Sequence, residues 1–228
     1  MTQKSGRTTA SYSRAYHSDT GVGRHSILYE VLGLTVAGSL ALRLLLLVMP
    51  TLPWVASLVW LYGPLVPLTL RRLPFAPYGY SLQPWYRTTG HALCVSLALL
   101  GTFALLILGW RLLAGVSLRL YVNALSWEIM LQQLVCVAMP EELFFRGYVQ
   151  ERLRLWAWQR SLPHHTTAIL LSAGLFTAVH LMVLPSWWRL AVFVPGCVMG
   201  WLRVSSRGLL APTLFHWLAN LLALVLRL

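Results

Sequence analysis

The chain has 228 residues, of which 57% are hydrophobic and only 11% are charged, and its mean hydropathy is +0.65. A soluble domain of this length needs a more highly charged surface, so the composition argues against a soluble globular protein. The net charge of +12 does not indicate nucleic-acid binding, because the arginines are scattered singly between apolar runs and form no basic stripe.

Residues 1–25 are polar and contain four cations against the single acid Asp19. They predict a flexible basic tail on the cytosolic side. An Arg- and Ser-rich, acid-poor start is also typical of an organelle transit peptide, which stays as an alternative. A cleaved secretory signal fits less well, because the first apolar run is long and no small-residue cleavage site follows it.

Seven apolar runs follow the tail, and several approach the roughly 20 residues that cross a bilayer. The two short runs contain Pro or Gly and are expected to be kinked or tilted. The pattern predicts an all-α, polytopic transmembrane helix bundle with about seven spans, within a range of six to eight, and residues 26–120 supply its N-terminal transmembrane helices. The runs are 26–49, 53–70, 91–115, 122–157, 165–184, 188–204 and 208–227.

The distribution of cations predicts the orientation of these spans. With the N-terminus in the cytosol, twelve Lys and Arg residues fall on the inner side and four on the outer side, as the positive-inside rule requires. Tryptophans near segment ends are typical of anchors at the membrane interface. Examples are Trp54, Trp110, Trp187 and Trp188.

Ionisable side chains inside these spans need an explanation, because they are costly in hydrocarbon. Glu30 and Arg43 lie toward the ends of the first span, and we interpret them as structural residues that reach the interface. Glu128 lies near the outer end of its segment and can reach water.

The stretch "MPEELFFRGY" (139–148) places two adjacent acids in an apolar segment. On a helix Glu142 and Arg146 are four residues apart and can form an ion pair. Glu141 is rotated by about 100° from its neighbour and faces elsewhere. Pro140 frees a backbone carbonyl and is expected to bend the helix. A purely structural ion pair explains Glu142 and Arg146 but leaves Glu141 unexplained.

Two further polar sets lie on later spans. "FTAVH" places Phe176 one turn before His180, and "HWLAN" places His216 and Asn220 on one helix face. A lone histidine in a span usually makes a helix–helix hydrogen bond, but here two histidines are joined by an amide. At 1.5 Å per residue, Glu141, His180, His216 and Asn220 lie about 20, 24, 12 and 18 Å from the cytosolic surface, so they can meet.

This set of side chains is suited to hydrolysis. Glu141 can act as general base on a water that His180 shares or orients, while His216 and Asn220 can stabilise an oxyanion. Alternatively, Glu141, His180 and His216 can bind zinc as a site of two histidines and one carboxylate with an open position for water. The spacing does not decide between them, although no H-E-x-x-H helix is present, which disfavours zinc.

The three stretches "EELFFR", "FTAVH" and "HWLAN" resemble the signature motifs of the CPBP family, which comprises type II CAAX prenyl endopeptidases and bacteriocin-processing, Abi-type membrane proteins. The resemblance covers about 125–225, keeps the order and spacing of the motifs, and implies that 121–228 form a CPBP-like catalytic helical core.

The resemblance implies an intramembrane glutamic endopeptidase that needs no metal or other cofactor. It assigns water activation to Glu141 with His180, and oxyanion stabilisation to His216 with Asn220. Structural support of the site falls to Glu142, Arg146 and Phe176.

Relatives in this family cleave after prenylated cysteines, process peptides or trim C-terminal membrane-sorting tails. We therefore expect a membrane-embedded or lipid-anchored protein or peptide as substrate, with the bilayer but no nucleic acid as a partner. The compact chain suits a multi-pass protein of the bacterial inner membrane.

Two other classes remain as alternatives. A proton-coupled transporter can bury the same residue types, although it predicts inverted repeats that the sequence lacks. A non-catalytic membrane scaffold predicts that Glu141→Gln preserves function.

Overall fold

The computed structural model describes residues 24–49, 53–80, 89–115, 120–183 and 185–226, and every regular element within them is helical. This confirms the predicted all-α class. Six helices within the described residues are ten or more residues long: α2 (Arg24–Val48), α3 (Pro53–Tyr62), α5 (Thr89–Leu113), α9 (His164–Val183), α10 (Phe193–Ser206) and α11 (Leu210–Leu226). Shorter elements are α4 (Leu65–Leu70), η1 (Ala76–Tyr78), η2 (Val122–Ala124) and η5 (Trp187–Val192).

Each predicted apolar run coincides with helix in the structure, to within a few residues at its ends. Three helices are long and apolar enough to cross a membrane, namely Ser26–Val48, Cys94–Leu113 and His164–Val183. Two shorter apolar helices, Ser57–Leu70 and Leu210–Leu226, fall below that length. The count of seven spans therefore stays a prediction, and most of the predicted tail lies outside the described residues.

One continuous helical segment forms the centre of the fold and runs from residue 127 to residue 158. It consists of α6 (Trp127–Gln132), η3 (Gln133–Ala138), α7 (Met139–Glu142), η4 (Leu143–Val149) and α8 (Gln150–Trp158), where η3 and η4 have π-helical hydrogen bonding. Pro140 has no backbone N–H, so it cannot complete the α-helical bond to the carbonyl of Cys136. The predicted disturbance at Pro140 thus takes the form of wider π turns, which occur frequently at functional sites.

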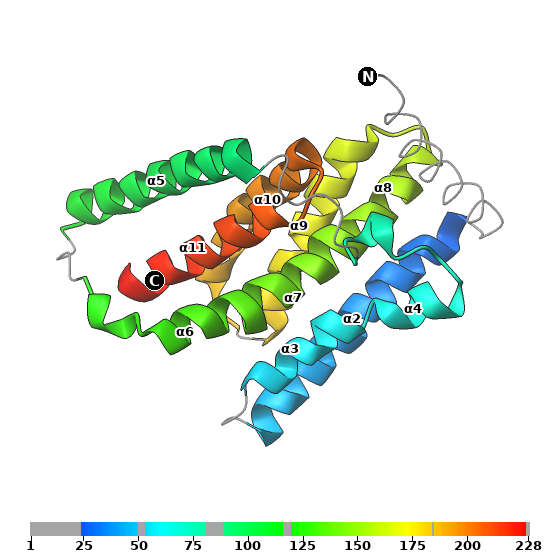
Figure 1. The fold of residues 1–228 in the computed structure, drawn as a ribbon, viewed down its shortest axis with the longest axis horizontal. Helices are drawn as coiled ribbons and strands as arrows, with labels where there is room; N and C mark the ends of the chain where they lie inside the picture. The colour runs from blue at the N-terminus through cyan, green and yellow to red at the C-terminus, as the bar shows by residue number, and fades with distance from the viewer. Residues whose placement is uncertain (1–23, 50–52, 81–88, 116–119, 184, 227–228) are drawn as a thin grey trace.

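Figure 1 shows how the other helices surround this central segment. Helices α9, α10 and α11 pack together on one side of it, and α2 with α3 packs on the other. Helix α5 lies at the edge of the bundle and packs mainly against α11. The middle of the segment, which carries both glutamates, is consequently enclosed by α3, α9, α10 and α11.

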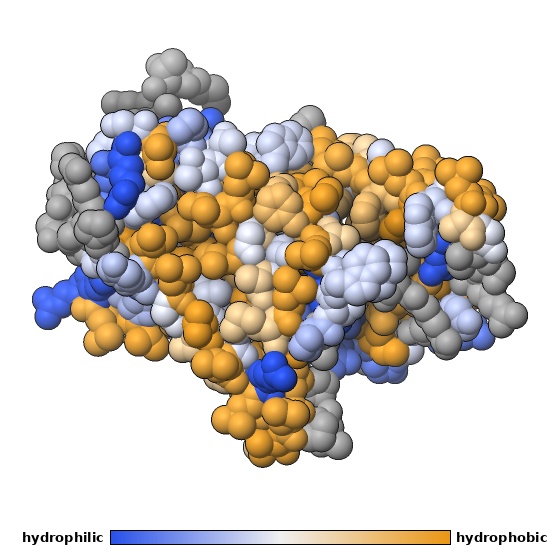
Figure 2. All heavy atoms as spheres, turned by 180° about the vertical axis from the view of Figure 1, so that it is seen from behind, coloured by the Kyte–Doolittle hydropathy of each residue, from blue (hydrophilic) through white to orange (hydrophobic). Residues whose placement is uncertain are grey.

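The interior and the outer surface are both apolar. Phe144, Phe145, Tyr148, Phe176 and Trp60 form the buried centre, whereas large apolar side chains cover much of the exterior, as the space-filling view shows in Figure 2. Such an exterior is expected for helices that face lipid, because the bilayer provides no reason to bury apolar side chains.

The tryptophans predicted as anchors are exposed, and three of them cluster. Trp187 stacks on Trp188 with ring centroids 3.5 Å apart, and Trp110 of α5 meets Trp188 edge-on at 6.4 Å. These rings gather where α5 ends and η5 begins, which is the arrangement expected of an aromatic group at one membrane interface.

Glu30, which we interpreted as a structural residue, takes part in a cluster of polar side chains. Its carboxylate accepts hydrogen bonds from Arg152 Nε at 2.9 Å and from the hydroxyl of Tyr148, and it forms an ion pair with Arg71 at 2.6 Å. The side chain of Arg152 is fully buried. This Glu30 cluster (Glu30, Arg71, Tyr148 and Arg152) joins α2, the end of α4 and the central segment. Arg43 also has a partner, since it donates to the carbonyl of Met182 near the end of α9 at 2.9 Å.

We expect Glu30→Gln to destabilise the fold by about 3–5 kcal/mol, because it removes the negative charge that Glu30 places against the buried Arg152 guanidinium. Thermal unfolding in detergent micelles measures the effect. Glu151→Gln is the matched control: its ion pair with Arg154 lies on one helix face with both side chains 17% exposed, so a loss of about 0.2–1 kcal/mol is expected. Equal losses from the two substitutions would contradict the proposed importance of the Glu30 cluster.

Candidate active site

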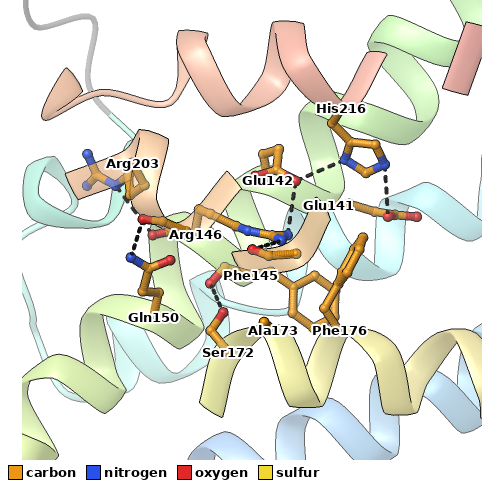
Figure 3. A network of polar contacts seen from close by, with 12 residues as sticks. Glu141, Glu142, Phe145, Arg146, Gln150, Ser172, Ala173, Phe176, Arg203 and His216 are labelled. Atoms are coloured by element: carbon orange, nitrogen blue, oxygen red, sulfur yellow. Dashed lines mark hydrogen bonds and ion pairs between the residues drawn. The ribbon is translucent and has the colours of Figure 1, made fainter. Parts of the chain in front are cut away.

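The predicted pair of Glu142 and Arg146 is present at the centre of the bundle, with both side chains fully buried. Arg146 donates to Glu142 Oε1 at 3.0 Å, and the same oxygen accepts from Nδ1 of His216 at 2.9 Å. Figure 3 shows these contacts, together with the ion pair between His216 and Glu141. One carboxylate oxygen therefore joins the central segment to α11.

Glu141 differs from Glu142 in both exposure and bonding. Its side chain is 17% exposed, and its Oε2 lies 3.7 Å from His216 Nε2. Among the described residues, Glu141 Oε2 is buried and has no hydrogen-bond partner. Glu142 Oε2 also lacks a partner, but the Glu142 side chain has no exposed surface at all. Glu141 is thus the carboxylate that a water molecule can approach.

Phe176 holds the charged and imidazole groups together. The Arg146 guanidinium lies 4.4 Å from the centroid of the Phe176 ring, at a distance typical of a cation–π contact. The rings of His180 and His216 lie 4.4 and 5.7 Å from the same centroid, the second at 90°. Nδ1 of His180 lies 2.9 Å from the carbonyl of Phe176, and His180 interacts electrostatically with Glu141 and His216.

The tautomers of the histidines follow from these contacts, because a carbonyl or carboxylate oxygen can only accept. Nδ1 of His180 therefore carries its hydrogen and donates to Phe176, so that Nε2 of a neutral ring is an acceptor. Nδ1 of His216 likewise donates to Glu142, and its Nε2 faces Glu141. Both histidines thus direct Nε2 rather than Nδ1 toward their remaining polar neighbours.

Helix α10 binds Arg146 and Gln150 of the central segment through the carbonyls of two glycines, neither of which was predicted as a site residue. Arg146 donates to the carbonyl of Gly196 at 3.1 Å, and Gln150 donates to the carbonyl of Gly200 at 3.0 Å. A Cβ at Gly196 would lie 3.2 Å from that of Ala173, and one at Gly200 would lie 3.1 Å from Gln150 Oε1. The G-x-x-x-G spacing of these residues is a sequence signal for such close helix packing.

The π turn η4 frees backbone carbonyls, and polar side chains from neighbouring helices bind them. Ser172 of α9 donates to the carbonyl of Phe145 at 3.1 Å. Arg203 of α10 donates to the carbonyl of Arg146 at 3.4 Å and to that of Pro77 at 3.1 Å. These contacts satisfy groups that would be costly to leave unpaired in a membrane. They also fix the backbone that carries Arg146.

Asn220 lies on the predicted face of α11, but its hydrogen-bond partner was not predicted. Its Nδ2 donates to Oε1 of Gln133 in η3 at 3.1 Å. The only sequence signal for Gln133 is an amide in an otherwise apolar run. The predicted joint action of Asn220 with His216 on an oxyanion stays a prediction.

The predicted zinc alternative can be compared with the geometry. Within the described ranges, no three His, Cys, Asp or Glu side chains are arranged to hold a metal ion, and these ranges include Glu141, His180 and His216. The three cysteines are also dispersed and free. The choice between the metal-free and the zinc mechanism stays a prediction, as do the catalytic roles of Glu141, His180, His216 and Asn220.

Comparison with known proteins finds one family that this region resembles. Residues 123–222 match the family model described as "Type II CAAX prenyl endopeptidase Rce1-like". No curated protein and no solved structure gives a significant match to the chain. The matched region spans the central segment and α9 to α11, and it includes every predicted site residue.

Three helices are long and apolar enough to cross a membrane. The matched range covers a little under half of the chain. Residues 123–222 are thus similar to a family of type II CAAX prenyl endopeptidases.

Proposed function

We propose that the chain is an intramembrane endopeptidase that hydrolyses a peptide bond of a membrane-associated protein or peptide, with Glu141 as the general base. The observation that carries this proposal is the different environment of two adjacent carboxylates. Glu142 is fully buried and bonded to Arg146 and His216, whereas Glu141 is partly exposed with a buried oxygen that has no partner among the described residues.

His180 and Glu141 together can hold a water molecule in a reactive orientation. Both present acceptors, since His180 uses its Nδ1 hydrogen on Phe176. A water that donates one hydrogen to Glu141 and the other to His180 keeps a lone pair directed away from both. General-base catalysis by a correctly positioned side chain typically accelerates a reaction by about 10²–10⁴-fold.

His216 is placed to act beside both carboxylates. Its Nδ1 donates to Glu142, and its Nε2 lies 3.7 Å from Glu141 Oε2. With a hydrogen on Nε2, His216 supplies a hydrogen bond to an oxyanion together with the amide of Asn220.

The proposed reaction has two steps, the addition of water and the release of the amine. In the first, the water oxygen attacks the peptide carbonyl carbon, one water proton passes to Glu141, and the carbonyl oxygen takes the negative charge. In the second, the C–N bond breaks, the oxyanion collapses to a carboxyl group, and Glu141 returns its proton to the departing nitrogen. The products are one new carboxyl terminus and one new amino terminus.

The substrate proposed is the C-terminal region of a prenylated, bacteriocin-like or sorting-tail protein. The support is the family match and the position of the site in the middle of a lipid-facing bundle. We further propose that the protein lies in a bacterial inner membrane with its N-terminus in the cytosol. The excess of cations on the segments assigned to the inner side supports that orientation.

Glu141→Gln is expected to lower kcat by about 10²–10⁴-fold, because an amide cannot accept the water proton. The measurement compares the C-termini of membrane proteins in cells that express either the wild type or the variant, followed by cleavage assays in vesicles. Glu151→Gln, a matched substitution on the same helical segment, should cleave like the wild type. Retained cleavage by Glu141→Gln would overturn the general-base assignment, and Glu141-dependent ion flux without cleavage would favour the transporter alternative.

Treatment with a strong zinc chelator is expected to leave cleavage unchanged, because the proposed reaction uses only side chains of the chain. Initial rates are measured in vesicles before and after prolonged dialysis against the chelator. Loss of cleavage that is restored by added zinc would favour the zinc alternative with Glu141, His180 and His216. The Glu141→Gln result alone cannot distinguish these two mechanisms, so both measurements are needed.

A farnesylated peptide that ends in a CAAX tetrapeptide tests the substrate class. If the chain acts on prenylated termini, this peptide should be cleaved in vesicles at least tenfold faster than the same peptide without its lipid, since the lipid brings the peptide bond to the membrane. The Glu141→Gln variant serves as the blank. Cleavage of a hydrophobic sorting-tail peptide but not of the farnesylated one would instead assign the enzyme to sorting tails.

A further inference from the structure

A pair of amides joins the central segment to α11 next to the proposed site. Asn220 Nδ2 donates to Gln133 Oε1 at 3.1 Å, and both side chains are half-buried. An amide has two donor hydrogens and one acceptor oxygen. Because Asn220 donates one of its hydrogens to Gln133, the orientation of its carboxamide group is fixed. A second hydrogen on the same nitrogen then remains for another acceptor.

The same two elements make a second hydrogen bond one turn away. Nε1 of Trp217 donates to the backbone carbonyl of Met130 at 2.8 Å. The two donors are three residues apart on α11, and the two acceptors are three residues apart on the central segment. Helix α11 and η3 also pack directly against each other. The Gln133 contact is therefore one of several that hold these two elements together, and Trp217 offers a matched comparison for it.

The winding of the central segment brings Gln133 toward the side of Glu141. The two residues are eight positions apart, which in an ideal α-helix is two turns plus about 80°. Residues 133–138 are π-helical, and a π turn contains more residues than an α turn. Eight residues therefore come closer to two complete turns, which turns the amide of Gln133 toward the face that carries the general base.

We propose that Gln133 is a positioning residue for Asn220. Its Oε1 accepts one Asn220 hydrogen and holds the amide with its nitrogen, not its oxygen, toward the reacting carbonyl. Without this acceptor the Asn220 amide can rotate and present its oxygen to the oxyanion, which would repel it. The proposal rests on the proposed proteolytic function and on the oxyanion role of Asn220.

The test compares four single substitutions, one of which is Asn220→Ala, with the double variant that combines Asn220→Ala and Gln133→Met. Gln133→Met keeps the length of the side chain and removes the strong acceptor, whereas Gln133→Glu keeps an acceptor oxygen at the same position. Trp217→Phe removes the neighbouring hydrogen bond between the same two elements and is the structural control. Each is assayed in vesicles for kcat and KM on the peptide whose cleavage depends on Glu141, and each is unfolded thermally in detergent.

Gln133→Met is expected to lower kcat by about 10- to 100-fold and to change KM by less than about threefold. This loss of kcat is smaller than the roughly 10²–10³-fold loss that follows when an oxyanion donor is removed entirely. Gln133→Glu should recover most of that loss. Trp217→Phe should lower the unfolding temperature as much as Gln133→Met does but leave kcat near the wild-type value. In an Asn220→Ala background, Gln133→Met should cause no further loss of kcat, as expected for residues that act as a unit.

The contrary outcomes are distinct. Equal kcat losses from Gln133→Met and Trp217→Phe, or an undiminished loss in the Asn220→Ala background, would overturn the positioning role while leaving the protease assignment intact. Full activity of Asn220→Ala would remove Asn220 from the oxyanion site and the proposal with it. Retained cleavage by Glu141→Gln would instead overturn the general-base assignment on which the proposed function rests.

Discussion

The buried ion pair between Glu142 and Arg146 is the constraint on which the rest of the structure depends. Two charges in a low-dielectric interior are stabilised by further contacts to their remaining donors and acceptors, although Glu142 Oε2 and Arg146 Nε have no hydrogen-bond partner among the described residues. The other partners are the carbonyl of Gly196, Nδ1 of His216 and the face of Phe176. Each partner belongs to a different helix, so that satisfying this single pair specifies how α9, α10 and α11 pack around the central segment.

The same pair explains why two adjacent acids can have different roles. Glu142 is bonded to Arg146 and His216, whereas Glu141 faces a different side of the helix, where its neighbour is His216 Nε2 at 3.7 Å. Of the two acids, Glu141 is therefore the one that the packing of the bundle leaves less firmly bonded. The π turns on both sides of "MPEE" contribute as well, because they change which residues share a face and free carbonyls that Ser172 and Arg203 then bind.

Much of the helical framework was predictable, since helix boundaries in this chain follow the apolar runs and the i,i+4 spacing of Glu142 and Arg146 is a local property. Partners distant in sequence were not predictable. Glu30 meets Arg152 across 122 positions, and a single acid in the first span carries no local sign of that partner. The partner of Asn220 was missed for the same reason, and the π turns because periodicity arguments assume α-helical winding.

The Glu30 cluster links the matched region to the helices that precede it. The family match begins at residue 123, yet Arg152, inside that region, is fully buried against a carboxylate that α2 supplies. A fragment cut at residue 123 would lose this carboxylate. The N-terminal helices therefore contribute to the interior of the matched region and do more than flank it.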